Sequence, residues 1–249
     1  MLAIVRQNAI RERLHARKSV TISELAQALG VTRETIRRDL RFMEEQGELI
    51  RTHGGAHLPE APADTPLTYR QDACMEAKEQ IAQKCCSLIL PGDTVFLDGS
   101  STAWYIARAI ARRSLTVLTP SLRIATLLAG SPNICLVLIG GDLSRTTASC
   151  SGSSACAALE QFFVDKAFLS PRFVSLDHGL TDPTEPEARL RKTAIAHSRN
   201  VYVAVDQTKL DETSFSFIAP LSDITALITE GPLPELWQAR LTAMGKKFY

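Results

Sequence analysis

Residues 96–110, "FLDGSSTAWYIARAI", contain the transition that decides the fold of most of this chain. An apolar run ends at Asp98, Gly99 permits a sharp turn, hydroxyl residues follow, and an amphipathic helical pattern begins. Strand, short polar loop and helix in this order form the unit from which parallel α/β sheets are built. The stretch therefore predicts an α/β fold. Because amide groups at a helix start can bind anions and hydroxyl residues there can also be simple caps, the loop fits either a phosphate-binding loop or a helix cap.

The same alternation continues on both sides of this stretch. Strand-like apolar runs at 94–98, 115–119, 134–139, 166–170, 200–205 and 224–229 alternate with helical patterns near 77–90, 101–111, 121–129, 153–162, 186–199 and 233–243. Such alternation predicts a mainly parallel sheet covered by helices.

Polar residues follow several of these strands. Thr119 and Ser121 follow the second run, Gly140 and Gly141 the third, and Lys209 the fifth. Ligands of open parallel sheets bind at the carboxyl ends of strands, so we expect these loops to converge with the loop of residues 98–102 on one anion site.

The N-terminal part has a different pattern. Residues 6–17 predict a helix, Ser23 is the expected N-cap of a second helix ending at Gly30, and Thr32 is the expected N-cap of a third ending at Gly47. Residues 48–58 predict a β-hairpin. Two helices joined by a tight turn and followed by a hairpin indicate a winged helix-turn-helix.

Arginine residues lie on the expected outward face of the third helix. Arginine can bind guanine edges or phosphates, and threonine can contact either. The expected DNA-binding residues are Ser23, Thr32, Arg33, Thr35, Arg37 and Arg38, with Arg51 and His53 of the hairpin meeting the DNA backbone or minor groove.

Charge is distributed unevenly over the 249 residues. The net charge is +1, but residues 1–57 hold ten Lys and Arg against seven Asp and Glu, and the remainder carries −2. A basic N-terminal end fits binding to nucleic acid.

Residues 58–76 include three prolines and no sustained periodicity, which predicts a linker.

Composition and cysteine spacing argue against membrane, secreted, metal-binding and cofactor-binding proteins. No apolar run has the ~20 residues of a membrane span, and no targeting segment is evident at the N-terminus, so we expect a cytoplasmic protein without membrane contact. The six cysteines form no CxxC pair and no metal-ligand spacing, so neither a metal nor a cofactor is expected.

The N-terminal motif resembles the winged helix-turn-helix of the DeoR family of bacterial transcriptional regulators. Residues 22–56 carry the resemblance, most specifically "TIRRDL" followed by Gly47, Arg51 and "HGGA". The resemblance implies a recognition helix over 32–45, in which Arg37 and Arg38 contact DNA and Asp39 orients the helix.

Residues 74–231 are similar to the sensor domain of the same family, whose fold resembles ribose-5-phosphate isomerase and the CoA transferases. Matching motifs are Asp98–Thr102, Thr119–Ser121, Gly140–Gly141, Asp206–Lys209 and the helix start Lys78–Ala82. Residues 97–110 in particular resemble the corresponding segment of an activator of an L-fucose operon. Pro120 stands where the family usually has Asn, and Phe173 where it often has Gly.

These observations divide the chain into three segments and predict one effector site. Residues 1–57 are expected to bind DNA, 58–76 to link, and 77–249 to sense a phosphorylated sugar. The expected effector-binding residues are Lys78, Asp98, Gly99, Ser100, Ser101, Thr102, Thr119, Ser121, Gly140, Gly141, Asp177 and Lys209.

The leading hypothesis is a non-enzymatic transcriptional regulator of a carbohydrate-utilisation operon. Its expected partners are a double-stranded DNA operator, a sugar-phosphate effector and further copies of itself, because helix-turn-helix proteins usually read paired half-sites. A sugar-phosphate isomerase-like enzyme with an appended DNA-binding module is the alternative. A nucleic-acid-binding scaffold with a vestigial sensor is a third possibility.

Overall fold

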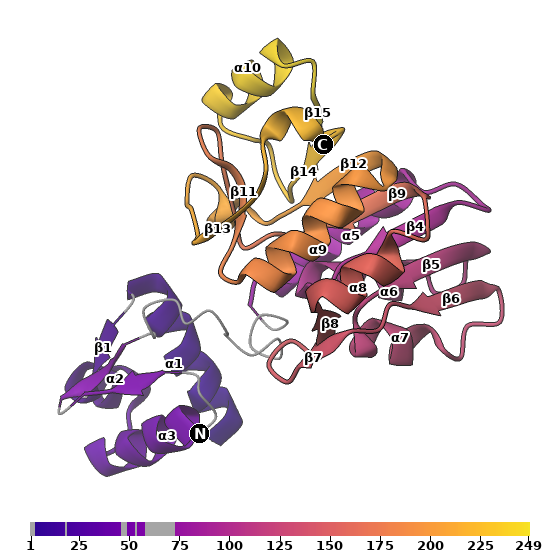
Figure 1. Ribbon diagram of the computed structural model, residues 1–249. Coiled ribbons are helices and arrows are strands. Elements are labelled where there is room, and N and C mark those ends of the chain that lie inside the picture. Colours follow the sequence, from indigo (N-terminus) through magenta and orange to yellow (C-terminus); the bar gives the residue numbers. More distant parts are fainter. Residues whose placement is uncertain (1–2, 18, 46–48, 53, 58–72) are drawn as a thin grey trace. The chain divides into compact units, whose positions relative to one another are not determined.

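The computed structural model forms two compact units, Met1–Tyr69 and Arg70–Tyr249, which we call the N-terminal and C-terminal units (Figure 1). It describes residues 3–17, 19–45, 49–52, 54–57 and 73–249. Gly47, His53 and residues 58–72 of the predicted linker lie outside the described residues. The helix α5 begins at Met75, so it includes the last two residues of the linker that was predicted to end at residue 76.

The N-terminal unit has the predicted winged helix-turn-helix arrangement. Its described elements are α1 (Ala3–Arg17), β1 (Ser19–Thr21), α2 (Ile22–Leu29), α3 (Arg33–Glu45), β2 (Ile50–Arg51) and β3 (Gly55–His57). The strand order is β1-β3-β2, with antiparallel pairs throughout, so β2 and β3 form the expected hairpin. Gly30 adopts the left-handed conformation that ends α2.

Apolar spacing explains the core of this unit. Ile36, Leu40 and Met43 recur at three- and four-residue intervals on α3 and are fully buried with Leu25 of α2 and Ile10 of α1. The opposite side of α3 is thereby left to its charged residues.

The C-terminal unit is built on a parallel sheet, as predicted. Its strands are β4 (Thr94–Leu97), β5 (Leu115–Thr119), β6 (Ile134–Leu138), β9 (Val164–Leu169), β12 (Ser198–Ala204), β14 (Ala226–Ile228) and β15 (Lys247–Phe248). The sheet order is β15-β14-β12-β9-β4-β5-β6, and each neighbouring pair is parallel.

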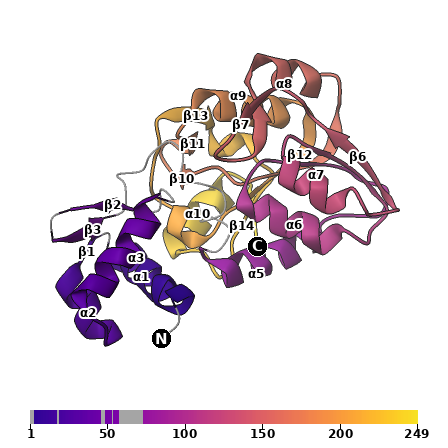
Figure 2. The same cartoon turned by 90° about the horizontal axis from the view of Figure 1, so that it is seen from below.

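Helices cover both faces of this sheet, as Figure 2 shows. One face packs against α5 (Met75–Ser87), α6 (Ser101–Ile110) and α7 (Leu122–Leu128). The other packs against α8 (Gly152–Leu159), α9 (Glu185–Ala196) and α10 (Glu235–Ala243). Alternate residues of one strand enter the two cores, with Val95 on the first side and Phe96 on the second.

Short antiparallel strands, which the sequence patterns do not predict, complete the unit. A hairpin joins β7 (Asp142–Ser144) to β8 (Ser149–Ser151), and a second sheet has the order β10 (Phe173–Ser175), β11 (Gly179–Asp182) and β13 (Ser216–Ala219). None of the helices formed by the described residues is both long and apolar enough to cross a bilayer.

Candidate functional site

The helix α3 presents arginines on the face opposite the core. Thr32 precedes the helix, and its Oγ1 accepts the backbone N–H of Thr35 at 3.2 Å, so the predicted N-cap is confirmed. Arg33 and Arg38 are exposed. Arg37 pairs with Glu34 at 3.1 Å, yet 52% of its side chain remains accessible. A surface pair of this kind contributes little stability and can exchange for a DNA phosphate.

Arg41 is an exposed residue of this face that the sequence reasoning missed. It lies one helical turn beyond Arg37, so the four-residue spacing from Arg33 through Arg37 was the signal that could have found it. The three side chains form a basic stripe along α3.

Asp39 joins the recognition helix to α1. The Asp39 side chain is buried and accepts a hydrogen bond from Arg6 Nη2 at 3.0 Å. Hydrogen bonding to Asp39, opposed by partial burial, raises the pKa of Arg6. This ion pair fixes one helix against another, in agreement with the expected orienting role of Asp39.

The predicted N-cap Ser23 is wrong, because Thr21 occupies that position. Thr21 has an extended backbone and exchanges hydrogen bonds with Glu24, three residues later, in a capping box. Ser23 is an exposed residue of the first helical turn instead.

The hairpin arginine is held against α3. The backbone N–H and Nε of Arg51 donate to the Glu44 carboxylate at 3.1 and 2.7 Å. The backbone hydrogen bond first, and then the guanidinium, lower the pKa of Glu44. These hydrogen bonds fix the position of Arg51 relative to α3.

In the C-terminal unit, Asp98 ties two strand ends together. Its Oδ1 accepts the Ser100 N–H at 3.0 Å, while its Oδ2 accepts the Ser170 N–H and Arg191 Nε, both at 2.8 Å. Burial opposes ionisation, but the Arg191 charge and these hydrogen bonds hold the pKa of Asp98 below its ordinary value. Asp98 is 2% exposed, so its carboxylate supports the loop from within.

A chain of polar groups connects the ends of β4, β9 and β12. Lys209 Nζ donates to Ser170 Oγ at 3.0 Å, and Ser170 Oγ donates to Thr102 Oγ1 at 3.1 Å. Ser100 caps α6 by accepting the Ala103 N–H at 3.0 Å. Lys209 is therefore connected through Ser170 to Thr102, at the start of α6.

This place is a topological switch point of the sheet. From β4 the chain moves outward through β5 and β6, then returns to β9 on the other side of β4. Loops leaving β4 and β9 therefore run in opposite directions, and open α/β sheets bind ligands in the crevice between such loops. The sequence could not reveal this adjacency before the strand order was known.

The loop after β5 approaches the same region through β8. Thr119 Oγ1 accepts the Ser121 N–H at 3.2 Å, and Ser121 caps α7. Ser121 also forms an isolated antiparallel β-bridge with Ser149. A Cβ atom added to Gly99 would lie 2.4 Å from Ser149 Oγ. Glycine at position 99 is thus required by the close approach of β8.

Gly140 and Gly141 lie between β6 and β7, at the carboxyl end of β6. Lys78 is a buried residue of α5 and donates to the Ala73 carbonyl. Burial raises the pKa of the neighbouring Cys74, and the charges of Asp206, Lys78 and Lys209 also act on that thiol. The start of α5 therefore lies near the loop that follows β12.

Asp177 stands apart from this cluster. It lies in the turn between β10 and β11, its side chain is 78% exposed, and it pairs with Arg240 of α10 at 3.4 Å. Among the described residues, the Asp177 side chain makes no hydrogen bond or ion pair with the strand-end loops.

Arg172 is a cation at the end of β9 that the sequence reasoning missed. Burial lowers its pKa, although Asp182 and Asp206 oppose this. Its guanidinium lies 5.4 Å from the Phe173 ring centroid, and no carboxylate of the described residues comes within ion-pair distance. No local sequence pattern could have found it, because only the adjacency of β4 and β9 in the sheet gives it a role.

The arrangement is suited to binding an oxyanion. Helix α6 supplies an N-terminus with buried hydroxyl residues, and Lys209 and Arg172 supply positive charge nearby. The carboxylate of Asp98 is already engaged by Arg191 and by backbone amides, so it is poorly placed to act as a general base.

Two family models together match almost the whole chain. The DeoR-like helix-turn-helix domain matches residues 6–61, and the DeoR C-terminal sensor domain matches residues 73–231.

Relatives of similar length support this match. The Bacillus subtilis uncharacterized HTH-type transcriptional regulator YulB is 36% identical over 94% of this chain and 91% of its own. The Escherichia coli HTH-type transcriptional repressor CsqR is 32% identical over 89% and 85%, and the E. coli glycerol-3-phosphate regulon repressor 31% over 92% and 91%.

Similar solved structures are more distant. Ribose 5-phosphate isomerase A from Methanocaldococcus jannaschii has a TM-score of 0.41 and 19% identity, covering 55% of this chain and 54% of that one. The delta subunit of eIF2B from Chaetomium thermophilum has a TM-score of 0.49 and 18% identity, covering 67% and 60%.

Proposed function

The chain belongs to the DeoR family of transcriptional regulators, and from this premise we propose that it binds an operator in response to a phosphorylated sugar. Relatives named as transcriptional regulators and repressors support a regulator over the alternative of an enzyme. We assign operator binding to residues 1–57, linkage to 58–76 and effector binding to 77–249. A cytoplasmic homo-oligomer acting on a carbohydrate-utilisation operon follows from this assignment.

Operator binding is assigned to α3 in the major groove of double-stranded DNA. The exposed Arg33, Arg37, Arg38 and Arg41 support it, because arginine reads guanine edges and neutralises phosphates. Thr32, Thr35, Ser23 and the hairpin residues Arg51 and His53 would add contacts to the DNA backbone.

A paired substitution tests this assignment. Arg37→Ala with Arg38→Ala is expected to weaken binding to the DNA beside the gene about 10- to 100-fold and to reduce the salt dependence. The matched control, Arg112→Ala with Arg199→Ala, removes the same charge from exposed residues of the C-terminal unit. Equal affinity of the two double variants in a gel-shift assay would show that α3 is not the reading helix.

Effector binding is assigned to the crevice between the loops after β4 and β9. The observation that carries it is the Lys209–Ser170–Thr102 chain of hydrogen bonds beside the cation Arg172. Two cations next to a helix N-terminus are a favourable environment for a phosphate dianion. The name of one relative, a glycerol-3-phosphate regulon repressor, fits a phosphorylated polyol or sugar.

The remaining residues of the site have distinct proposed roles. Backbone amides of Ser101 and Thr102 bind the phosphate, and Ser100 and Asp98 hold their loop in place. The loops after β5 and β6, with Thr119, Ser121, Gly140 and Gly141, border the sugar, while Gly99 keeps β8 close to the phosphate loop. Lys78 adds positive charge from α5.

A ligand screen tests the effector assignment. Unfolding of the C-terminal unit can be followed by tryptophan fluorescence, because Trp104 and Trp237 both lie in it. A matching sugar phosphate at saturation is expected to raise the melting temperature by about 5 °C. Lys209→Met and Arg172→Met are each expected to remove most of this shift.

Arg199→Met is the matched control, because Arg199 lies at the amino end of β12, at the opposite edge of the sheet from Lys209. Its shift should equal that of the unmodified protein. If Lys209→Met and Arg172→Met also show the full shift in melting temperature, the effector binds elsewhere. If the corresponding unphosphorylated sugars give the full shift, the phosphate is not what the site recognises.

A further inference from the structure

Arg172 carries a guanidinium that no protein group engages. The residue is half-buried, and its backbone N–H donates to Asp182 Oδ1 at 2.9 Å. Within the described part of the chain, its side chain donates no hydrogen bond and forms no ion pair. An arginine offers five N–H donors, and donors withdrawn from water without an acceptor cost free energy. A ligand that accepts hydrogen bonds from this guanidinium removes that cost.

The backbone of Arg172 is held in place on both sides. Lys209 Nζ donates to the carbonyl of Pro171 at 3.3 Å, and the Arg172 N–H donates to Asp182. The peptide unit that joins Pro171 to Arg172 therefore has its oxygen fixed by one charged side chain and its N–H by another. The side chain of Arg172 starts from a rigid point beside the ammonium of Lys209.

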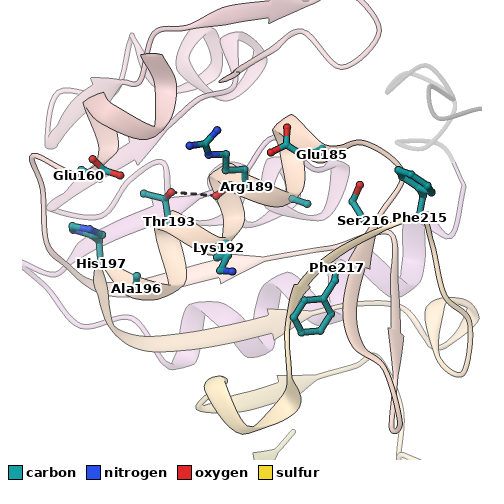
Figure 3. Close-up of a pocket in the computed structure, with 11 residues that line it drawn as sticks. Glu160, Glu185, Arg189, Lys192, Thr193, Ala196, His197, Phe215, Ser216 and Phe217 are labelled. Carbon is teal, nitrogen blue, oxygen red and sulfur yellow. Dashed lines mark hydrogen bonds between the residues drawn. The ribbon is translucent and has the colours of Figure 1, made fainter. Parts of the chain in front are cut away.

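Arg191 connects this point to the loop of residues 98–102. It comes from the inner side of α9, where it donates to Asp182 and, at 2.8 Å, to Asp98. Its side chain is 8% exposed, whereas Arg189 and Lys192 line an open groove of about 600 Å³ on the outer side of α9 (Figure 3). Buried charges thus join the backbone of Arg172 to the loop, and the fold sets the distance between them.

Phe173 supports the side chain of Arg172. The guanidinium lies over the Phe173 ring, 5.4 Å from the ring centroid, which is within the range of a cation–π interaction. Phe173 stands where the family often has Gly, so this aromatic support is a feature of the present chain. A guanidinium supported on one face keeps its N–H edges for a flat acceptor with two oxygens, such as a carboxylate.

The charges around Arg172 favour a carboxylate over a second phosphate. Burial lowers the pKa of Arg172, and the negative charges of Asp182 and Asp206 oppose this effect. Negative charge is therefore already present, and a carboxylate adds one unit of it, where a phosphate adds about 1.5 to 2. Lys209, joined through Ser170 to the start of α6, remains the cation for the phosphate.

We propose that Arg172 binds a carboxylate of the effector, so that the effector is a phosphorylated sugar acid. This inference rests on the proposed function, because it takes the phosphate of the same molecule to lie at the start of α6 beside Lys209. The effector is then held by an anionic group at each end, and Arg172 distinguishes it from a sugar phosphate that lacks the carboxylate.

Isothermal titration calorimetry with matched pairs of compounds tests the proposal. The pairs are 4-phosphoerythronate with erythritol 4-phosphate, 5-phosphoribonate with ribitol 5-phosphate, and 6-phosphogluconate with glucitol 6-phosphate. The members of a pair differ only in having a carboxylate or a hydroxymethyl group at one end. At least one acid is expected to bind about 10- to 100-fold more tightly than its polyol, because the acid gains a charge-assisted, bidentate contact.

Variants separate the two ends of the site. Arg172→Met keeps an apolar contact with Phe173 but removes the donors, so the acid and the polyol should bind it with equal affinity. Arg172→Lys keeps the charge without the paired donors and should lose most of the preference as well. Lys209→Met should weaken both compounds and retain the preference. The control Arg199→Met, at the amino end of β12, should bind both as the unmodified protein does.

The proposal is overturned if no acid binds more tightly than its polyol, or if Arg172→Met retains the preference. Polyol phosphates that bind the unmodified protein and lose affinity in Lys209→Met would leave the proposed phosphate site standing in either case. If none of the six compounds binds, the proposed function falls together with this inference.

Discussion

At the residue scale, two buried carboxylates share one arginine. Arg191 donates to Asp98 at 2.8 Å and also contacts Asp182, and all three side chains are almost fully buried. Burial raises the pKa of Asp182 to about 6, even though the Arg191 charge opposes this. Asp98 keeps its charge because it has two backbone amides as well as Arg191.

This arrangement predicts an unusual pH dependence of stability. An unfolded Asp ionises near pH 3.9, whereas folded Asp182 keeps its proton up to about pH 6. The folded state therefore binds an additional proton between these values, so this group's contribution to the free energy of unfolding falls by about 3 kcal/mol as the pH rises through them. Asp182→Asn should abolish that fall.

Urea unfolding followed by tryptophan fluorescence at pH 4.5 and 7 measures the effect. Asp177→Asn is the control, because it makes the same chemical change in a side chain that is 78% exposed. If Asp182→Asn lost as much stability between the two pH values as Asp177→Asn, Asp182 would be ionised throughout.

Residue roles were only partly predictable from the sequence. The positions of Asp98 and Lys209 after apolar strands indicated the correct sheet edge. The bonding of Asp98 to Arg191, 93 positions away, and to the amide of Ser170 depends on strand order, which no local pattern contains. Arg172 was missed for the same reason, since only the adjacency of β4 and β9 gives it a role.

At the element scale, the pairing of β1 with β3 depends on one close approach. Thr21 is opposite Gly55, and a Cβ on Gly55 would lie 2.0 Å from the Val20 carbonyl oxygen. Gly55→Ala is therefore expected to destabilise the N-terminal unit by about 2 kcal/mol or more and to weaken operator binding. Gly54→Ala should have little effect, because a Cβ there meets nothing within 4 Å.

Hydrogen–deuterium exchange of peptides from residues 3–57 measures this difference. Faster exchange in β1 and β3 of Gly55→Ala, but not of Gly54→Ala, is the expected result. Equal protection in both variants would mean that the strands can separate to admit a methyl group without cost.

Elements long enough to show a repeating pattern of apolar residues could be predicted from the sequence, and short elements could not. The predicted strand run 115–119 coincides with β5, and the helical pattern near 101–111 differs from α6 by a single residue. The strands β7, β8 and β10 have three residues each, too few for an alternating pattern to stand out. The cap of α2 was misplaced because serine is the better N-cap of the two by propensity, and only the Glu24 partner favours Thr21.

At the scale of the whole molecule, the chain joins a DNA-reading unit to a sensing unit. An effector can change the affinity of the protein for DNA only under one condition. The conformation that binds DNA strongly and the one that binds it weakly must differ in their affinity for that effector. The sequence predicted both units, but the identity of an effector depends on side-chain placement, which no local pattern contains. Of the two departures from the family pattern, Pro120 directly follows β5, and Phe173 is the first residue of β10.

We propose that a sugar phosphate bound near Lys209 controls operator binding. Fluorescence anisotropy of a labelled operator, with and without a sugar phosphate that raises the melting temperature, tests it most directly. We predict that operator affinity changes by about 5- to 150-fold in the unmodified protein and stays constant in Lys209→Met. An operator affinity that does not respond to the bound sugar phosphate, or a full response in Lys209→Met, would contradict the account.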